Sequence, residues 1–448
     1  MKRILTTITA SLALALAGPY AHAQAPGASA TLFQNANIFD GKNEPLATDM
    51  DVLVEGNKIA KIAKTIEAPD GAKIIDAKGR TLMPGLSDCH WHTLQAAVTN
   101  IDLFTKDPNY NTLQVAFGAE RVLMNGFTTV RDMGGNIFGV KQMIDEGRLP
   151  GPRILPSGAF LTPTSGHAEM RFPNVLIREE GRPLIDQEIL GNTAIADGVP
   201  AVLKRTRENL MRGASQLKVM AGGGVSSLSD PMDGAQFTRA ELEAIVEEAG
   251  NWNTYVTVHA YTAKAVQHAL KAGVRSIEHG HMIDEETAKM IADAGARVCM
   301  QPFQDDQDRI PFPKGSFSNY KYELLLAGVD TAFKLAKKNN IKIGFGTDMQ
   351  NNPTLIDRQA AQIPKLTRWF TPFEALRIAT SGNQEFFRLS GARHPYQEGP
   401  LGVVQEGAYA DLLLVEGNPL ENIEVIADPK ANFKIIMKDG KIYKNTLQ

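Results

Sequence analysis

The sequence predicts an α/β fold in which a (β/α)8 TIM barrel carries a small β-sandwich built from both ends of the chain. Two observations predict it. Apolar, β-rich runs alternate with helical patterns in the middle of the chain, and short strand patterns with turn residues between them lie near both ends. Of the 448 residues, 43% are hydrophobic and 22% are charged, so the chain has an ordinary globular composition and can bury a large core.

The first segment has the features of a secretory signal peptide. Lys2 and Arg3 precede an apolar stretch around residues 12–16, and Ala21-His22-Ala23 supplies small residues before Gln24. This run is too short to span a bilayer of ~30 Å, although a retained anchor is the alternative. With residues 1–23 removed, we expect a periplasmic or secreted protein without an integral membrane segment in the mature chain.

The two ends of the chain share one sequence pattern. Short alternating segments separated by turns predict strands in residues 30–83, and the same pattern returns in residues 396–448. Because chain termini often lie close together, we expect these two segments to form one β-sandwich domain.

Residues 84–395 predict the barrel. Eight β-rich runs are separated by helical patterns, three of which span residues 239–251, 262–272 and 284–294. Crossover helices imply parallel strands, and eight such units in about 310 residues fit a closed barrel, with a doubly wound open sheet as the alternative. Besides a strand that ends at His90, the predicted strands are 127–130, 153–156, 216–220, 255–259, 276–279, 296–300 and 342–348. The long connections after the third and seventh strands are expected to cover a site.

Histidines and one aspartate stand at the carboxyl ends of the predicted strands, the face of a barrel that holds active sites. His90 and His92 are two residues apart, so on a strand their imidazoles point to the same side and can reach one cation. Unrelated surface histidines are the alternative for this pair alone. The full set of polar strand-end residues is His90, His92, His259, His279 and Asp348.

Lys218 occupies an equivalent position in an apolar strand, where an unpaired ammonium would be costly to bury. An ammonium has no lone pair for a metal. A carbamate on the same nitrogen would supply two anionic oxygens and could bridge two cations. A lysine that faces outward or forms a salt bridge is the alternative.

Charge and cysteine content exclude other classes of function. Lys plus Arg number 47 against 50 Asp plus Glu, a net charge of −3, so the chain has no basic excess for a nucleic-acid partner. The two cysteines, Cys89 and Cys299, cannot build a disulfide framework or a four-thiolate zinc site. A metal would therefore need histidines and carboxylates, and Cys89 is expected to face away from it and to be inert.

The chain closely resembles the metal-dependent amidohydrolase superfamily in its binuclear form. The resemblance rests on the strand-end residues, Lys218, the Gly407–Leu412 segment and the segment Leu82-Met83-Pro84-Gly85-Leu86-Ser87-Asp88-Cys89-His90-Trp91-His92. The resemblance implies that His90, His92 and Asp348 bind one metal and that His259 and His279 bind the other. It also implies that Lys218 bridges the two divalent ions as a carbamate. Zinc suits an imidazole-rich site, and manganese, cobalt and iron remain open.

Residues 161–167 and 259–262 resemble the branch of prolidases and imidazolonepropionase-like carboxypeptidases that includes ochratoxin-degrading amidases. This resemblance implies that His167 and Tyr261 contact the scissile group of a substrate. The alternatives are a plain loop histidine and a packing tyrosine. Arg171, Arg178 and Arg309 are candidate partners for a substrate carboxylate, with exposed arginine as their alternative.

The implied function is an exported hydrolase that cleaves the amide bond of dipeptides or N-acyl amino acids by attack of a metal-bridging hydroxide, with Asp348 accepting the proton. Xaa-Pro dipeptides and amides like ochratoxin A are candidate substrates. A cyclic-amide hydrolase or deaminase on the same scaffold, or a non-catalytic solute- or metal-binding module, is the alternative. The partners would be small molecules or short peptides, and the resemblance makes a homo-oligomer, such as an octamer, plausible.

Overall fold

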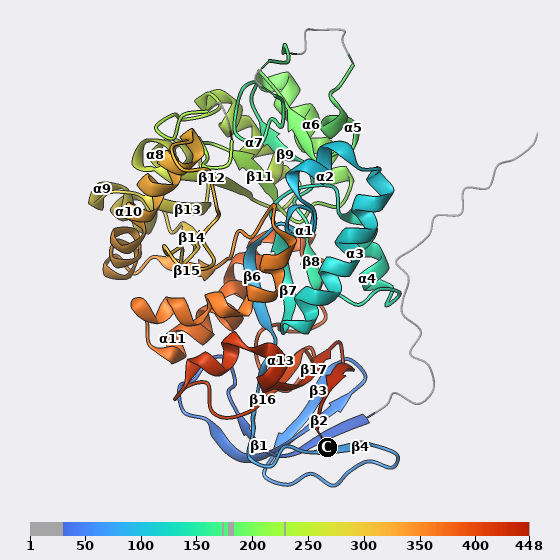
Figure 1. Cartoon of the computed structure of the whole chain (residues 1–448). Coiled ribbons are helices and arrows are strands. Elements are labelled where there is room, and N and C mark those ends of the chain that lie inside the picture. Colours follow the sequence, from blue (N-terminus) through green and yellow to red (C-terminus); the bar gives the residue numbers. More distant parts are fainter. Residues whose placement is uncertain (1–29, 173, 178–182, 228–229, 448) are drawn as a thin grey trace, which may run out of the picture.

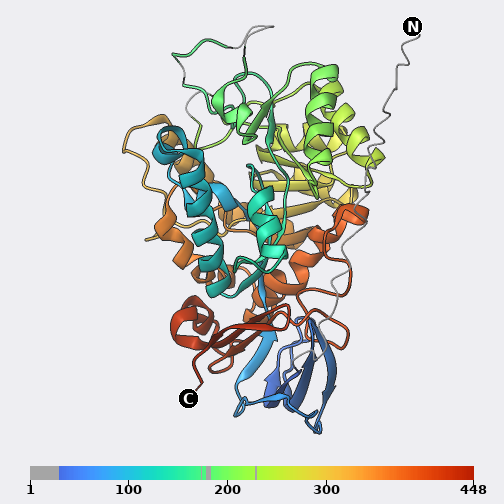
Figure 2. The same cartoon turned by 90° about the vertical axis from the view of Figure 1, so that its right-hand side faces the viewer.

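The computed structural model describes residues 30–447 except 173, 178–182 and 228–229. The predicted signal peptide, residues 1–23, lies outside these described residues. A barrel lies above a smaller β-structure in two perpendicular views (Figures 1 and 2). None of the described helices is both long and apolar enough to cross a membrane.

The smaller part is a sandwich-like sheet made from both ends of the chain, as predicted. Its strand order is β18-β17-β16-β5-β1-β2-β3, with β4 paired to β1. The two ends join where β5 pairs antiparallel with β16, Leu82 lying opposite Leu414, and Figure 1 shows the blue and red strands together. The strands are β1 (Ala30–Ile38), β2 (Ala47–Glu55), β3 (Lys58–Ala63), β4 (Lys73–Asp76), β5 (Thr81–Pro84), β16 (Leu412–Val415), β17 (Phe433–Lys438) and β18 (Lys441–Asn445).

The larger part is a TIM barrel of parallel strands. Three strands pair in the order β6-β7-β8 and seven in the order β10-β9-β11-β12-β13-β14-β15. They are β6 (Leu86–Trp91), β7 (Phe127–Asp132), β8 (Arg153–Leu155), β9 (Phe160–Thr162), β10 (Thr193–Ile195), β11 (Leu217–Met220), β12 (Val256–Thr262), β13 (Ser276–Met282), β14 (Arg297–Met300) and β15 (Lys342–Phe345).

The third predicted strand, residues 153–156, is present as β8, but a second short strand, β9, follows it that the sequence did not predict. β8 pairs with β7 on one side, and β9 pairs with β11 on the other. Between them Pro156 has no N–H for a ladder, and Gly158 has a φ of +73°, which favours glycine. The break redirects the chain and lets β9 begin beside the next strand.

The three predicted helices are present as α7 (Arg239–Asn251), α8 (Ala263–Lys271) and α9 (Glu285–Asp293). Each begins after a side chain that accepts a hydrogen bond from the first turn: Thr238, Thr262 and Asp284. The remaining α-helices are α1 (Thr93–Ala97), α2 (Asn100–Thr105), α3 (Pro108–Met124), α4 (Phe138–Asp145), α5 (Asp186–Ile189), α6 (Val199–Met211), α10 (Phe317–Lys338), α11 (Pro372–Arg377), α12 (Asn383–Phe387) and α13 (Pro429–Asn432).

An ion cluster around the buried Arg153 holds the barrel on the sandwich. Arg153 of β8 donates to Asp411 from Nε at 3.0 Å and to Asp439 from Nη2 at 2.6 Å. Its guanidinium also lies 4.1 Å from the ring centroid of Tyr409. These carboxylates hold the pKa of Arg153 above its usual value despite burial, which alone would lower it. The cluster therefore fixes the end of β8 against the β17–β18 turn.

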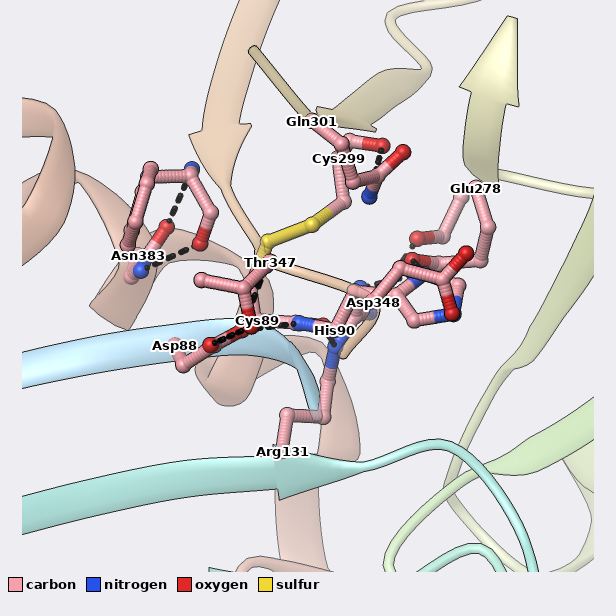
Figure 3. Close-up of a disulfide and its surroundings, with 12 residues drawn as sticks. Asp88, Cys89, His90, Arg131, Glu278, Cys299, Gln301, Thr347, Asp348 and Asn383 are labelled. Atoms are coloured by element: carbon pink, nitrogen blue, oxygen red, sulfur yellow. Dashed lines mark hydrogen bonds and ion pairs between the residues drawn. A yellow bond between two sulfur atoms is a disulfide. The ribbon is translucent and has the colours of Figure 1, made fainter. Parts of the chain in front are cut away.

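Cys89 of β6 and Cys299 of β14 form a disulfide across a sequence separation of 210 residues (Figure 3). The sequence predicts that Cys89 faces away from the metals, is inert and has no bonding partner. The structure corrects that expectation, because folding brings the two strands within 6.4 Å, measured between the Cα atoms.

Candidate active site

The structure brings the six predicted metal-site residues together at the carboxyl ends of the barrel strands. All six are buried and all line one cavity. They come from β6, the residue between β6 and α1, β11, β12, β13 and the segment after β15: His90, His92, Lys218, His259, His279 and Asp348.

The polar atoms of these residues approach one another closely. His90 Nε2 lies 3.2 Å from His92 Nε2, and His92 Nε2 lies 3.0 Å from Asp348 Oδ1. The ring of His279 lies 4.7 Å from that of His90 and 4.6 Å from that of His259, measured between centroids. Ligand atoms of His90, His279 and Asp348 all lie within 4.8 Å of one another, a spacing that one cation could bridge.

Burial sets the charges of these groups. It lowers the pKa of His90, His259 and His279 well below the usual value, and the Lys218 ammonium lowers all three further. Burial alone would raise the pKa of Asp348, but the hydrogen bond from His92 and the nearby His279 bring it below its usual value. Neutral imidazoles around an ionised carboxylate are a donor set that fits a divalent cation.

Lys218 is buried among these ligands. Its Nζ lies 3.3 Å from His90 Nε2, and no described carboxylate forms an ion pair with it. Burial lowers the pKa of Lys218 to about 8, and the charges of Glu278 and Asp348 oppose that effect. An ammonium at this position is poorly stabilised, because its neighbour is an imidazole nitrogen and not a carboxylate.

Two of the candidate ligands have left-handed backbone conformations. φ is +80° at His279 and +52° at Asp348. Such residues cost about 1–3 kcal/mol when they are not glycine and cluster at functional sites. Asp348 is held in place by a hydrogen bond from its backbone N–H to the His90 carbonyl oxygen at 2.9 Å.

Two further residues orient the imidazoles. Glu278 Oε2 accepts from His90 Nδ1 at 2.8 Å, while its Oε1 accepts from Arg131 Nη2 at 2.6 Å. Gln301 Oε1 accepts from His279 Nδ1 at 2.8 Å. Each imidazole that donates from Nδ1 leaves Nε2 free to bind a metal. Glu278 has no predicted role from the sequence, although a charged residue inside an apolar strand, directly before His279, was the available signal.

His167 and Tyr261 also lie beside the ligands. The His167 ring stacks on His259 at 4.2 Å and contacts Ser227 Oγ through Nδ1 at 3.1 Å. The Tyr261 ring stacks on His279 at 4.6 Å. Burial lowers the pKa of His167 to about 4 and raises the pKa of Tyr261 well above its usual value, so both are neutral near pH 7.

The cavity has a volume of about 580 Å³, and its wall away from the ligands mixes apolar with polar residues. Both long connections that the sequence predicts to cover a site contribute to its wall, with Phe172 from one and Phe312 from the other. Arg171 also lines the cavity, but its Nε donates to Glu169 at 2.6 Å. Arg309 pairs with Asp305 and Glu323, and Arg178 lies outside the described residues.

Comparison with known proteins matches this arrangement to one family. The model of the amidohydrolase family matches residues 81–444. Ochratoxinase of Aspergillus niger is 30% identical over 459 residues, which covers 95% of this chain and 89% of the relative. These matches confirm the resemblance predicted from the sequence.

Solved structures are similar over nearly the whole described chain. A prolidase in complex with N-methylphosphonate-L-proline has 32% identity and a TM-score of 0.82, with 93% of this chain and 100% of that chain covered. A Xaa-Pro dipeptidase with methionine bound in its active site has 28% identity, a TM-score of 0.79 and the same coverage. The ochratoxinase structure has 27% identity and a TM-score of 0.78, covering 93% and 96%.

Exchanging Glu278 for Gln should weaken metal binding. The amide keeps the shape of the side chain but removes the charge that pairs with Arg131 and strengthens the hydrogen bond from His90. Changes to residues that orient ligands typically cost about 10–100-fold in metal affinity, and we expect that range here. Zinc titration against a competing chelator measures it. Glu247→Gln, on the exposed face of α7, is the matched control, and equal affinities for the two variants would contradict the orienting role.

Proposed function

Because the chain belongs to the amidohydrolase family and is a hydrolase that acts on amide bonds, we propose that it is an exported enzyme with two metal ions that releases the C-terminal amino acid from dipeptides or N-acyl amino acids. The observation that carries the proposal is the convergence of four imidazoles, Asp348 and Lys218 in one buried cavity. The alternative of a pure binding module gains no support from these relatives, whose names are those of hydrolases.

The proposed ligand assignment follows the donor set. His90, His92 and Asp348 would hold one ion and His259 and His279 the other, with zinc as the first choice for imidazole ligands. Lys218 would join the two as a carbamate. Its amine adds to CO2 and loses one proton, a reaction of the neutral amine, which the lowered pKa of about 8 favours. The carbamate would replace a buried cation with the anion that two metals need.

Three polar residues of the cavity have proposed tasks in amide cleavage. When bound, the divalent ions lower the pKa of water and polarise a carbonyl. Asp348 would accept the proton of the attacking water at its carboxylate and deliver it to the departing amine. Tyr261, whose raised pKa keeps its hydroxyl protonated, would donate a hydrogen bond to the developing oxyanion, and His167 would contact the same scissile group.

The cavity supports an apolar substrate. Phenylalanines 160, 172, 303 and 312 line it together with Leu103 and Leu325, and apolar walls with a few polar groups are typical of small-molecule sites. The similar proteins include an ochratoxinase, a prolidase in complex with N-methylphosphonate-L-proline and a Xaa-Pro dipeptidase with bound methionine. We therefore propose Xaa-Pro dipeptides and N-aryl-acyl phenylalanine amides as the first substrates to test.

A substrate panel tests this proposal directly. The mature chain is loaded with zinc and given Xaa-Pro dipeptides and N-acyl amino acids, and released amino acid is measured with and without chelator. We expect release that chelation abolishes, with two metals per chain by elemental analysis. One metal per chain would favour the deaminase alternative. An inert, metal-replete protein would favour the binding module.

Exchanging Asp348 for Asn should remove turnover while retaining much of the metal. The amide can still bind through its oxygen but cannot accept the proton, and loss of such a group typically lowers the rate by about 10²–10⁴-fold. Steady-state kcat and metal content measure the two effects separately. Asp70→Asn, in an exposed turn, is the matched control, and near-wild-type kcat in the Asp348 variant would refute the proton role.

Export is proposed from the sequence of residues 1–23. The charged start, the apolar stretch and the small residues before Gln24 support cleavage after Ala23. N-terminal sequencing of the protein recovered outside the cytoplasm should begin at Gln24. An exported form that begins at Met1 or Lys2 would contradict removal of the segment.

A further inference from the structure

The Cys89–Cys299 disulfide lies directly behind the candidate metal ligands. Cys89 immediately precedes His90 on β6, and Cys299 on β14 stands two residues before Gln301 (Figure 3). Both cysteines are fully buried. None of the catalytic tasks proposed above uses this bond.

The bond passes over a strand instead of joining direct neighbours. In the β14–β15 ladder Cys299 lies opposite Gly344, and the segment that follows β15 bonds to β6, so β15 lies between the two cysteines. A Cβ on Gly344 would lie 2.6 Å from Cys89 Sγ, and one on Gly346 would lie 2.8 Å from Cys299 Sγ. The two glycines therefore leave the space through which the disulfide runs.

The strand that it crosses borders the seam of the barrel. Among the described strands, no β-ladder connects β15 to β6. Hydrogen bonds next to the ligands make the contact instead. Thr347 N donates to Asp88 Oδ1 at 3.2 Å, and Asp348 N donates to the His90 carbonyl oxygen. Since His90 and Asp348 stand on opposite sides of this seam, widening it would separate the ligands of one metal.

The two cysteines of the disulfide are connected to ligands of different proposed metals. At one end Cys89 is bonded through the backbone to His90. At the other, the Cys299 carbonyl oxygen accepts from Gln301 Nε2 at 3.4 Å, and Gln301 Oε1 accepts from His279 Nδ1 at 2.8 Å. The bond thus connects His90 of one proposed metal with His279 of the other.

We propose that the Cys89–Cys299 disulfide is a positioning element of the metal centre, which fixes the spacing across the β15–β6 seam and thereby retains the metals. The inference rests on the proposed metal-binding function. When the bond forms, two thiols lose two protons and two electrons and gain one S–S bond. The electrons pass to a disulfide oxidant of the extracytoplasmic compartment, which is reduced to its two thiols.

The test compares zinc release from the wild-type chain and the Cys89→Ala/Cys299→Ala variant, both loaded with zinc and mixed with a chromogenic chelator. We expect zinc to leave the variant about 10–100-fold faster, the range typical of lost ligand support. Leu414→Ala is the control, because it removes buried contacts in the sandwich and lowers the unfolding temperature away from the site. Its zinc release should match that of wild type.

Either of two results of the zinc-release experiment would overturn the proposal. One is wild-type zinc release from the double alanine variant, and the other is the same acceleration in Leu414→Ala, which would mark a general effect of stability. If the double variant does not fold, the wild-type chain treated with a phosphine reductant before zinc loading takes its place. Alkylation of denatured, unreduced protein should label neither cysteine, and labelling of both would remove the premise. Zinc release is measured without any substrate. The result therefore tests the disulfide even if the substrate panel shows no hydrolysis.

Discussion

The ion pair between Arg131 and Glu278 is the interaction on which the centre of the barrel depends. The guanidinium donates to Glu278, to the Cys89 carbonyl oxygen at 2.7 Å and to the Tyr255 hydroxyl at 2.9 Å. Burial would lower the pKa of Arg131, but the charge of Glu278 raises it above the usual value. One cation therefore joins strands β6, β7 and β13 and pairs with the carboxylate that lies beneath His90. A buried charge is tolerated only with such a partner, and breaking a pair of this kind typically costs about 3–5 kcal/mol.

The sequence predicts those site residues whose position along a strand determines which way the side chain points. His90 and His92 share a face because strand side chains alternate, and His259 and His279 follow apolar runs that end at the same rim of the barrel. The helices that begin at Arg239 and Glu285 follow local capping residues. In each case a short stretch of sequence determines the side-chain orientation or the start of the helix.

The features that escaped prediction have causes that are distant in the sequence. The extra strand β9 was missed because it pairs with β11 while β8 pairs with β7, and no local pattern indicates these partners. Glu278 needs Arg131, 147 residues away, and Cys89 needs Cys299, 210 residues away. Sequence patterns indicated which strand ends carry the chemistry, whereas the contacts that orient those side chains required the packed barrel.

The pairing of β5 with β16 has a consequence for how the chain is made. β5 is synthesised before the barrel and β16 after it, so β5 has no partner on that side until most of the chain exists. Such a contact closes a very long loop, and contacts of large sequence separation slow folding. A chain released early from the ribosome would leave the edge of β5 open to other chains. β5 therefore gains this neighbour only after the whole barrel has been synthesised.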